Sequence, residues 1–198
     1  MKRTTTRHRR QLKRFFTENR RLFPFAGLFL AGVMAGVAVY RATGSGSALD
    51  RLLPVPPITD GWLVGLWQSG FSALVLLVAL FLLGLWACGA PFILLVPLFH
   101  GLGLGLTEAY YYAQGDVGTV ALLVMPVGLL YAVVLTMAGV ESLRLSTGLS
   151  RRLLPTGEEG GLWDGFRLYG LRFLLFLAAT LLVAGLDVAL RLLLPQYL

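Results

Sequence analysis

Long apolar segments without charge dominate the pattern of this chain. Between Asp60 and Glu108 there is no Asp, Glu, Lys or Arg, and the run is interrupted near its middle by Gly89, Ala90 and Pro91. A bilayer core about 30 Å thick is crossed by roughly 20 helical residues, so this run is long enough for two spans. The pattern predicts a membrane hairpin in which two helices fold back on each other at the Gly-Pro break.

The remaining apolar runs predict three more spans. Backbone polar groups inside a bilayer must be satisfied within the structure, which restricts spans to helices and closed barrels. A barrel needs alternating segments of about 10 residues, whereas the runs here are continuous. We therefore expect an all-α integral membrane protein in which residues 23–198 form one membrane domain. Its spans are expected near residues 23–40, 71–88, 91–107, 118–140 and 169–194.

Composition supports this fold class. Charged residues make up 14% of the chain, well below the roughly 25% that is usual in soluble domains. The single cysteine, Cys88, excludes an internal disulfide framework and a multi-cysteine metal site. We expect an integral, multi-pass membrane protein.

The distribution of lysine and arginine predicts the orientation. Nine of the 17 basic residues fall in residues 1–22, and four more fall in the connection 141–168, so both segments are expected to be cytoplasmic. The outer segment 41–70 has only two. The basic N-terminal segment is accounted for by topology and by anionic lipid at the inner face, and no nucleic-acid partner is expected.

Two segments predict short amphipathic helices in the inner interface. In the first, apolar residues fall near one helical face and basic residues cover the others; its apolar residues are Leu12, Phe15, Phe16, Leu22 and Phe23. The second enters the fifth span; its apolar residues are Leu162, Trp163, Phe166 and Tyr169.

The outer segment 41–70 is a candidate surface for an extracytoplasmic partner. It is too short to fold as an independent domain. Its tryptophans, Trp62 and Trp67, suit the membrane interface, where tryptophan is enriched. The segment is expected either to dock a partner or to act only as a connector.

Ionisable residues at membrane depth are functional candidates, because an unsatisfied charge there costs several kcal/mol. Asp187 and Arg191 are four residues apart and are expected to pair on one helix face. Glu141 and Arg144 are expected to pair in the same way at the inner interface. His100 has no local partner, so it either makes a hydrogen bond between helices or serves transport or proton transfer.

Small residues recur at a spacing that lets membrane helices approach closely. Gly32 and Gly36 form one G-x-x-x-G pattern in the first span, and Gly101 and Gly105 form another in the third. The contact lies either within the chain or between two copies, so a homodimer is left open.

Proline predicts an irregular third span. Pro91 and Pro97 precede a series of glycines, which favours a kinked or discontinuous helix. Transporters build binding sites from such helices, and many packed bundles contain them as well.

Motifs of the common enzyme classes are missing. The chain contains no G-x-x-x-x-G-K-[ST], no H-E-x-x-H and no G-x-S-x-G. Its soluble segments are too short to hold a catalytic domain. We therefore expect no enzyme activity, no catalytic residues, no bound cofactor and no metal site.

The hairpin also carries a resemblance to a known family. The stretch from Leu83 through Gly84 and Gly89 to Pro91 has the form L-G-x-x-x-x-G-x-P and leads into His100 followed by glycine. It resembles the stage II sporulation protein M family, and the likeness extends over most of the chain, including a fourth span that contains proline. Two departures are the histidine, where lysine is frequent, and Val127-Gly128, where polar residues are common.

This resemblance implies a non-enzymatic membrane scaffold in endospore formation. Members are thought to hold two membrane-anchored cell-wall hydrolases, an amidase-type enzyme and a lytic transglycosylase, at the septal membrane during engulfment. On that basis the outer segment, Trp62, Trp67 and the exposed spans are the expected partner surfaces. The alternative is a permease-like subunit of a transporter that works with a separate ATPase, which His100 and the irregular third span favour.

Overall fold

The computed structural model describes residues 22–43, 53, 61–152 and 162–193, and every regular element in these ranges is helical. The basic N-terminal segment with the first amphipathic helix, and most of the outer segment before residue 61, lie outside the described residues. The elements in chain order are α2 (Leu22–Thr43), α3 (Trp62–Leu85), α4 (Ala90–Ala113), α5 (Val117–Thr119), the π-helix η2 (Val120–Val124), α6 (Met125–Arg152) and α7 (Leu162–Leu193).

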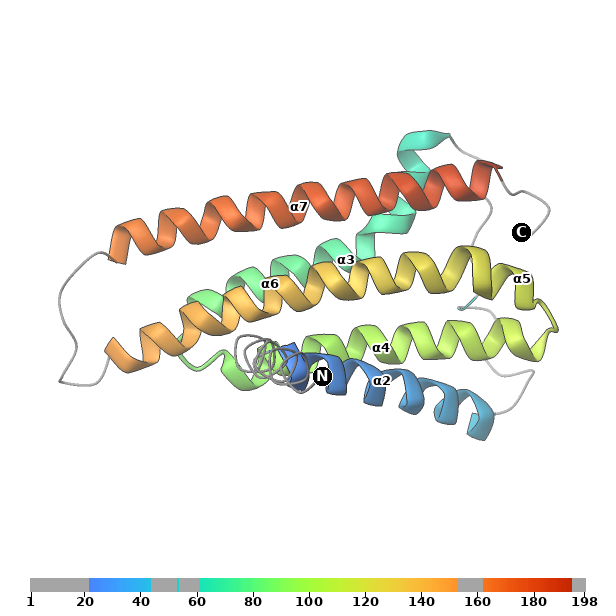
Figure 1. Cartoon of the computed structure of the whole chain (residues 1–198), viewed down its shortest axis with the longest axis horizontal. Helices are drawn as coiled ribbons and strands as arrows, with labels where there is room; N and C mark the ends of the chain where they lie inside the picture. Colours follow the sequence, from blue (N-terminus) through green and yellow to red (C-terminus); the bar gives the residue numbers. More distant parts are fainter. Residues whose placement is uncertain (1–21, 44–52, 54–60, 153–161, 194–198) are drawn as a thin grey trace, which may run out of the picture.

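Five of the helical segments are long and apolar enough to cross a membrane, which confirms the predicted fold class. α5, η2 and α6 follow one another without a break and form a single span. The spans run roughly along one direction (Figure 1), and α6 contacts α2, α3, α4 and α7. The large side chains Phe25, Leu80, Ile93 and Leu135 are fully buried around this central helix.

All five spans contain more helical residues than the apolar runs that predicted them. α3 begins at Trp62 rather than near Phe71, so the end of the expected outer segment is helical. α6 continues to Arg152, and α7 already begins at Leu162, so the second amphipathic segment is the start of α7 and not a separate helix. Hydropathy reports where a chain can cross the bilayer, whereas helical hydrogen bonding continues beyond that boundary where nothing terminates it.

The two G-x-x-x-G patterns face each other between α2 and α4. A Cβ atom added at Gly32 would overlap the backbone carbonyl oxygen of Leu98, and one added at Gly105 would overlap that of Val33. Gly36 and Gly101 are equally close to the opposite backbone. These glycines therefore make a contact within one chain, at backbone-to-backbone distance.

The hairpin turn connects α3 to α4 in very few residues. The Gly89 N–H donates to Trp86 O at 2.9 Å, and a Cβ at Gly89 would overlap Leu83 O, so glycine is required there. Pro91 follows in the first turn of α4, where the missing N–H is no loss. We call this end of the bundle the hairpin end, and the opposite end, which contains the α4–α5 turn, the Gln114 end.

The fourth span contains an irregular helical segment. α4 runs without interruption through Pro97, which corrects the expectation of a discontinuous third span and leaves that of a kinked one as a prediction. In the fourth span Pro126 has no N–H to give to Leu122 O, and its ring crowds that carbonyl in a regular α-helix. The preceding turns are accordingly wound as the π-helix η2, in which the Met125 N–H donates to Val120 O.

Helix α3 bends after its first turns. In Figure 1 its N-terminal part stands at an angle to the remainder. This part of the helix contains Ser69-Gly70, a Gly/Ser pair of the kind at which helices kink. A Cβ at Gly70 would approach the Ala184 Cβ to 3.3 Å, so this part of α3 packs closely on α7. We call residues 62–69 the tryptophan arm.

Candidate functional site

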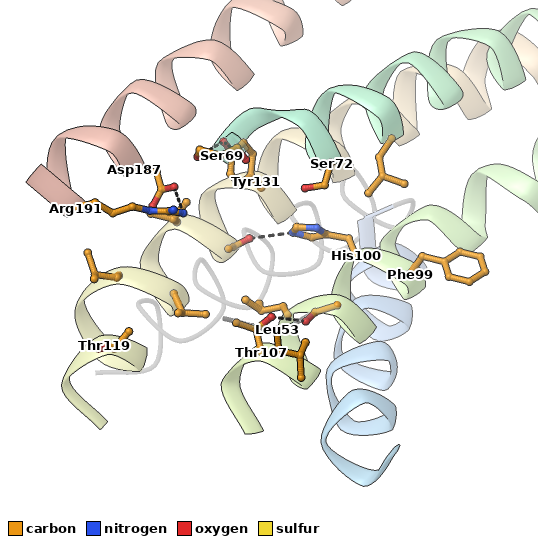
Figure 2. A pocket seen from close by; sticks show the side chains of 17 residues that line it. Leu53, Ser69, Ser72, Phe99, His100, Thr107, Thr119, Tyr131, Asp187 and Arg191 are labelled. Atoms are coloured by element: carbon orange, nitrogen blue, oxygen red, sulfur yellow. Dashed lines mark hydrogen bonds and ion pairs between the residues drawn. The ribbon is translucent and has the colours of Figure 1, made fainter. Parts of the chain in front are cut away.

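A polar cavity of about 390 Å³ lies among α3, α4, η2, α6 and α7. Figure 2 shows that its side chains come from helices on every side. The cavity lies in the part of the bundle toward the Gln114 end, and Leu53 of the outer segment also lines it. Its polar lining residues are Ser69, Ser72, His100, Thr107, Thr119, Tyr131, Asp187 and Arg191.

The predicted pair on the fifth span is confirmed and forms one wall of this cavity. Arg191 donates from Nη2 to the Asp187 carboxylate, one turn earlier on α7. Asp187 is only 2% exposed. A buried carboxylate is expensive unless it is paired, so the spacing of four residues makes this charge tolerable in the membrane.

Tyr131 and Ser69 join α6 to the tryptophan arm at the same cavity. Their hydroxyl oxygens lie 3.4 Å apart, and the Tyr131 hydroxyl is also 3.4 Å from Ser69 O. The Tyr131 hydroxyl of α6 therefore lies within reach of both the hydroxyl and the backbone carbonyl of Ser69 on α3. Neither residue is charged or belongs to a recognisable sequence motif. Their place in the site follows only from the packing of α3 against α6.

His100 points into the cavity and bonds across to the fourth span. Its Nε2 lies 3.1 Å from Gly128 O (Figure 2), and because a carbonyl oxygen only accepts, Nε2 carries the proton of this bond. The ring also stacks on Phe29 of α2, with centroids 5.9 Å apart. Of the two roles open to it from sequence, the structure shows the hydrogen bond between helices.

Gly128 is tightly packed. A Cβ there would overlap the Leu104 side chain. The backbone carbonyl of Gly128 accepts the hydrogen bond from His100.

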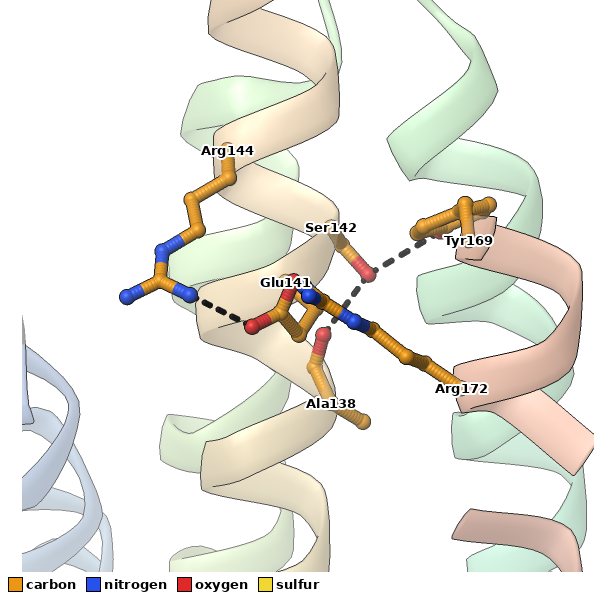
Figure 3. A network of polar contacts seen from close by, with 6 residues as sticks. All are labelled: Ala138, Glu141, Ser142, Arg144, Tyr169 and Arg172. Atoms are coloured by element: carbon orange, nitrogen blue, oxygen red, sulfur yellow. Dashed lines mark hydrogen bonds and ion pairs between the residues drawn. The ribbon is translucent and has the colours of Figure 1, made fainter. Parts of the chain in front are cut away.

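A second polar network lies toward the hairpin end. Glu141 accepts from Arg144 at 2.6 Å, as predicted, and from Arg172 of α7 at 2.5 Å, which the sequence did not indicate (Figure 3). The carboxylate thereby links α6 to α7. The Tyr169 hydroxyl lies 3.2 Å from Ser142 Oγ in the same network.

Serines of α6 hold the hairpin turn. Ser146 Oγ donates to Trp86 O at 2.8 Å, and Ser150 Oγ donates to Ala87 O. With Ser142 these residues recur at every fourth position, so they occupy one helical face. That spacing is visible in the sequence, but the partners of the serines are carbonyls of a distant segment.

The candidate residues from the sequence are distributed over several places. His100 and the Asp187–Arg191 pair line the polar cavity, whereas the four glycines of the G-x-x-x-G patterns lie between α2 and α4. Gly84 makes room for Tyr169, and Gly89 and Pro91 form the hairpin turn. Trp62 and Trp67 are exposed on the tryptophan arm, away from the cavity.

The described residues hold no group of three or more His, Cys, Asp and Glu side chains arranged to bind a metal ion. The polar groups of the cavity are hydroxyls, one imidazole and one neutralised ion pair. This chemistry suits hydrogen bonding to a neutral or amphiphilic molecule better than coordination of a cation.

Comparison with known proteins gives one family. The model of the family described as Stage II sporulation protein M matches residues 25–186, which includes all five spans in whole or in large part. No curated protein and no solved structure matches the chain.

Proposed function

Because this chain belongs to the stage II sporulation protein M family, we propose that it is a non-enzymatic membrane scaffold of endospore formation. In this proposal it holds membrane-anchored cell-wall hydrolases, an amidase-type enzyme and a lytic transglycosylase, at the septal membrane during engulfment. The Gln114 end would face outward, where these enzymes act.

The tryptophan arm is the observation that carries this proposal. One side of the arm packs on α7, where Leu66 approaches Gly185 and Gly70 approaches Ala184. The other side is open: Trp62 is 46% exposed, Leu63 79% and Trp67 61%. An aromatic and apolar surface that stands at the end of the bundle is available to another membrane protein.

Tryptophan is suited both to the membrane interface and to contact with a partner protein. It is enriched at membrane interfaces, and it is among the residues that contribute most to protein–protein binding. The arm is helical and contacts α7 and, through Ser69, Tyr131, so part of its ordering precedes any binding. These features support a docking role beyond that of a connector.

Crosslinking in sporulating cells tests the proposal. A photoreactive amino acid is placed at Leu63 of the arm, and a control is placed at Met34 of α2, which is 73% exposed on another helix. We expect Leu63 to capture a cell-wall hydrolase and Met34 to capture lipid only. Equal capture from both positions, or none from Leu63 while engulfment proceeds normally, would rule out the arm as the docking surface.

The permease-like alternative is favoured by one observation, the polar cavity with His100. The two functions differ in their response to His100→Ala. A scaffold keeps its recruitment of hydrolases, because Trp62, Leu63 and Trp67 do not line the cavity that contains His100, whereas a proton-coupled carrier loses its activity. Localisation of the hydrolases and progress of engulfment in the variant distinguish the two.

A further inference from the structure

A net positive charge lies on the outside of the bundle toward the hairpin end. Glu141 of α6 binds Arg144 of its own helix and Arg172 of α7, and in Figure 3 the two arginines reach its carboxylate from opposite sides. One carboxylate balances only one guanidinium, so these three residues, which we call the arginine clamp, carry one net positive charge. The Arg144 side chain is 51% exposed and that of Arg172 is 42% exposed, so this charge faces the surroundings of the protein.

Both arginines of the clamp have hydrogen-bond donors to spare. Each uses only Nη1 toward Glu141, and among the described residues neither guanidinium makes a further hydrogen bond or ion pair. A guanidinium carries five N–H donors in a planar fork that fits the oxygens of a carboxylate or a phosphate. Because both guanidiniums are held on the two oxygens of one carboxylate, they lie close enough for one anion with several oxygens to meet both.

The clamp lies at the level of the membrane interface. Phe25 in the first turn of α2 packs against Gly139 of α6, so α2 begins near the level of Glu141. Ser146, five residues beyond Glu141, binds the hairpin turn, so at 1.5 Å per residue Glu141 lies about 8 Å inside that turn. The headgroup region on each side of the hydrocarbon core is about 5–8 Å thick. With the turn at the water side of this region, the clamp lies at its inner boundary, from which arginine side chains extend toward the phosphates.

The face of α6 that carries the clamp is continuous with the surface that meets lipid. Met137 and Val133 precede Glu141 by four and eight residues, so they fall on the same helical face. They are 52% and 56% exposed. The anion nearest to the clamp is therefore the phosphate of a lipid whose acyl chains lie against this face, and a free phosphate would leave the apolar part uncovered.

From the net charge, the unused donors and the position at the interface, we propose that the arginine clamp binds the phosphate of one anionic phospholipid whose headgroup carries no positive charge, such as phosphatidylglycerol. Its single negative charge balances that of the clamp, as in other basic sites between membrane helices. A zwitterionic headgroup would bring an ammonium group toward two guanidiniums, which is unfavourable. The clamp and the tryptophan arm lie at opposite ends of the bundle, so this site does not depend on the proposed docking role.

Photolabelling of the full chain in phosphatidylcholine vesicles tests the site. The vesicles contain a trace of either phosphatidylglycerol or phosphatidylcholine that carries a diazirine in the same acyl chain, and labelled residues are mapped by mass spectrometry. We expect the phosphatidylglycerol probe to label Met137 about tenfold more than the phosphatidylcholine probe, equivalent to about 1.4 kcal/mol. Val78 of α3 is the reference, because it is 54% exposed in the same half of the bundle, and both probes should label it equally.

Removal of one guanidinium provides the decisive comparison. In Arg172→Gln and in Arg144→Gln we expect labelling of Met137 by the phosphatidylglycerol probe to fall to the level of the phosphatidylcholine probe. Arg10→Gln is the matched control, because it removes the same charge from the basic N-terminal segment, and it should leave the labelling unchanged. Arg144 pairs within its own helix, so its variant keeps the test decisive if Arg172→Gln does not fold.

Glu141→Gln separates the loss of a cation from the loss of the ion pairs. It weakens the link between α6 and α7 but keeps both guanidiniums, so the preference for phosphatidylglycerol should persist. Equal labelling of Met137 by the two probes in the wild type would overturn the proposal, as would an equal loss in Arg10→Gln and Arg172→Gln. Suppression of the Met137 label by millimolar inorganic phosphate would overturn it as well, because the clamp would then be a site for a free anion.

Discussion

At the scale of single residues, one hydroxyl joins three helices. Tyr169 of α7 reaches Phe81 O of α3 at 3.0 Å and Ser142 Oγ of α6 at 3.2 Å. Its ring stacks on Phe81, with centroids 5.3 Å apart. A Cβ at Gly84 would overlap the Tyr169 hydroxyl, so the first glycine of the family-like hairpin motif is explained by this tyrosine.

Removal of this hydroxyl tests its contribution. Tyr169→Phe keeps the ring and its packing but removes the hydrogen bonds, and we expect the free energy of unfolding in detergent micelles to fall by about 1 kcal/mol. Tyr112→Phe is the control, because Tyr112 is 55% exposed near the end of α4 and should show no change. Equal effects of the two variants would contradict a structural role for the Tyr169 hydroxyl.

The glycines between α2 and α4 allow a test of the contact between these two helices. A Cβ atom added at one of them would meet the backbone of the opposite helix, which cannot move aside as a side chain can. Gly32→Ala forces α2 away from Leu98 O, and we expect destabilisation of about 1–3 kcal/mol, the usual range for overpacking. Gly27→Ala lies on the same helix with open space around it and should be neutral or slightly stabilising. Thermal unfolding of both variants in the same detergent makes the comparison. A Gly32→Ala protein as stable as Gly27→Ala would show that the two helices are not in backbone contact.

At the scale of elements, α6 holds the α3–α4 hairpin by its serine face. The Ser146 side chain is fully buried and donates to Trp86 O, which also accepts the Gly89 N–H within the turn. We expect Ser146→Ala to destabilise the protein by about 1 kcal/mol, because the hydrogen bond that joins the turn to α6 is lost.

Thr147→Ala is the matched control for the serine face. The Thr147 hydroxyl donates to Leu143 O of its own helix, a carbonyl that already takes part in the helical ladder. Its removal should change the free energy of unfolding by less than half of the Ser146→Ala effect. If the threonine variant were the less stable of the two, the turn would not depend on α6.

The number and type of the elements could be predicted from sequence, because apolar length alone determines how often a helical chain crosses a bilayer. The true start of α3 could not be predicted from sequence, because the segment from Trp62 to Gly70 is apolar but is interrupted by Gly, Gln and Ser. Those residues end a hydropathy window without ending a helix. The π-helix was equally hidden, because Pro126 can be accommodated by a kink, a break or extra winding.

The candidate site was predictable only where its residues are close in sequence. The Asp187–Arg191 pair follows from a spacing of four on one helix. The bond from His100 to Gly128 and that from Tyr131 to Ser69 connect residues far apart in the chain. Which helix faces meet is a property of packing, so these contacts leave no local pattern.

At the scale of the whole molecule, polar groups are gathered inside and apolar side chains face outward. The described spans expose leucine, valine and phenylalanine over most of their length, as a surface in contact with lipid requires. The ion pairs, the serine face and the polar cavity lie between helices. The two ends of this bundle are distinguished by the hairpin turn and by the α4–α5 turn, and the basic residues predict that the hairpin end faces the cytoplasm.

The single native cysteine makes this orientation directly testable. Cys88 is exposed in the hairpin turn, and Gln114 is exposed at the opposite end of the bundle. A membrane-impermeant maleimide should leave Cys88 unlabelled in intact cells and label it after permeabilisation. The Cys88→Ser, Gln114→Cys double variant should be labelled in both conditions. Because one thiol is present in each protein, labelling of Cys88 in intact cells would invert the proposed topology, and with it the side of the membrane on which the tryptophan arm can meet a cell-wall hydrolase.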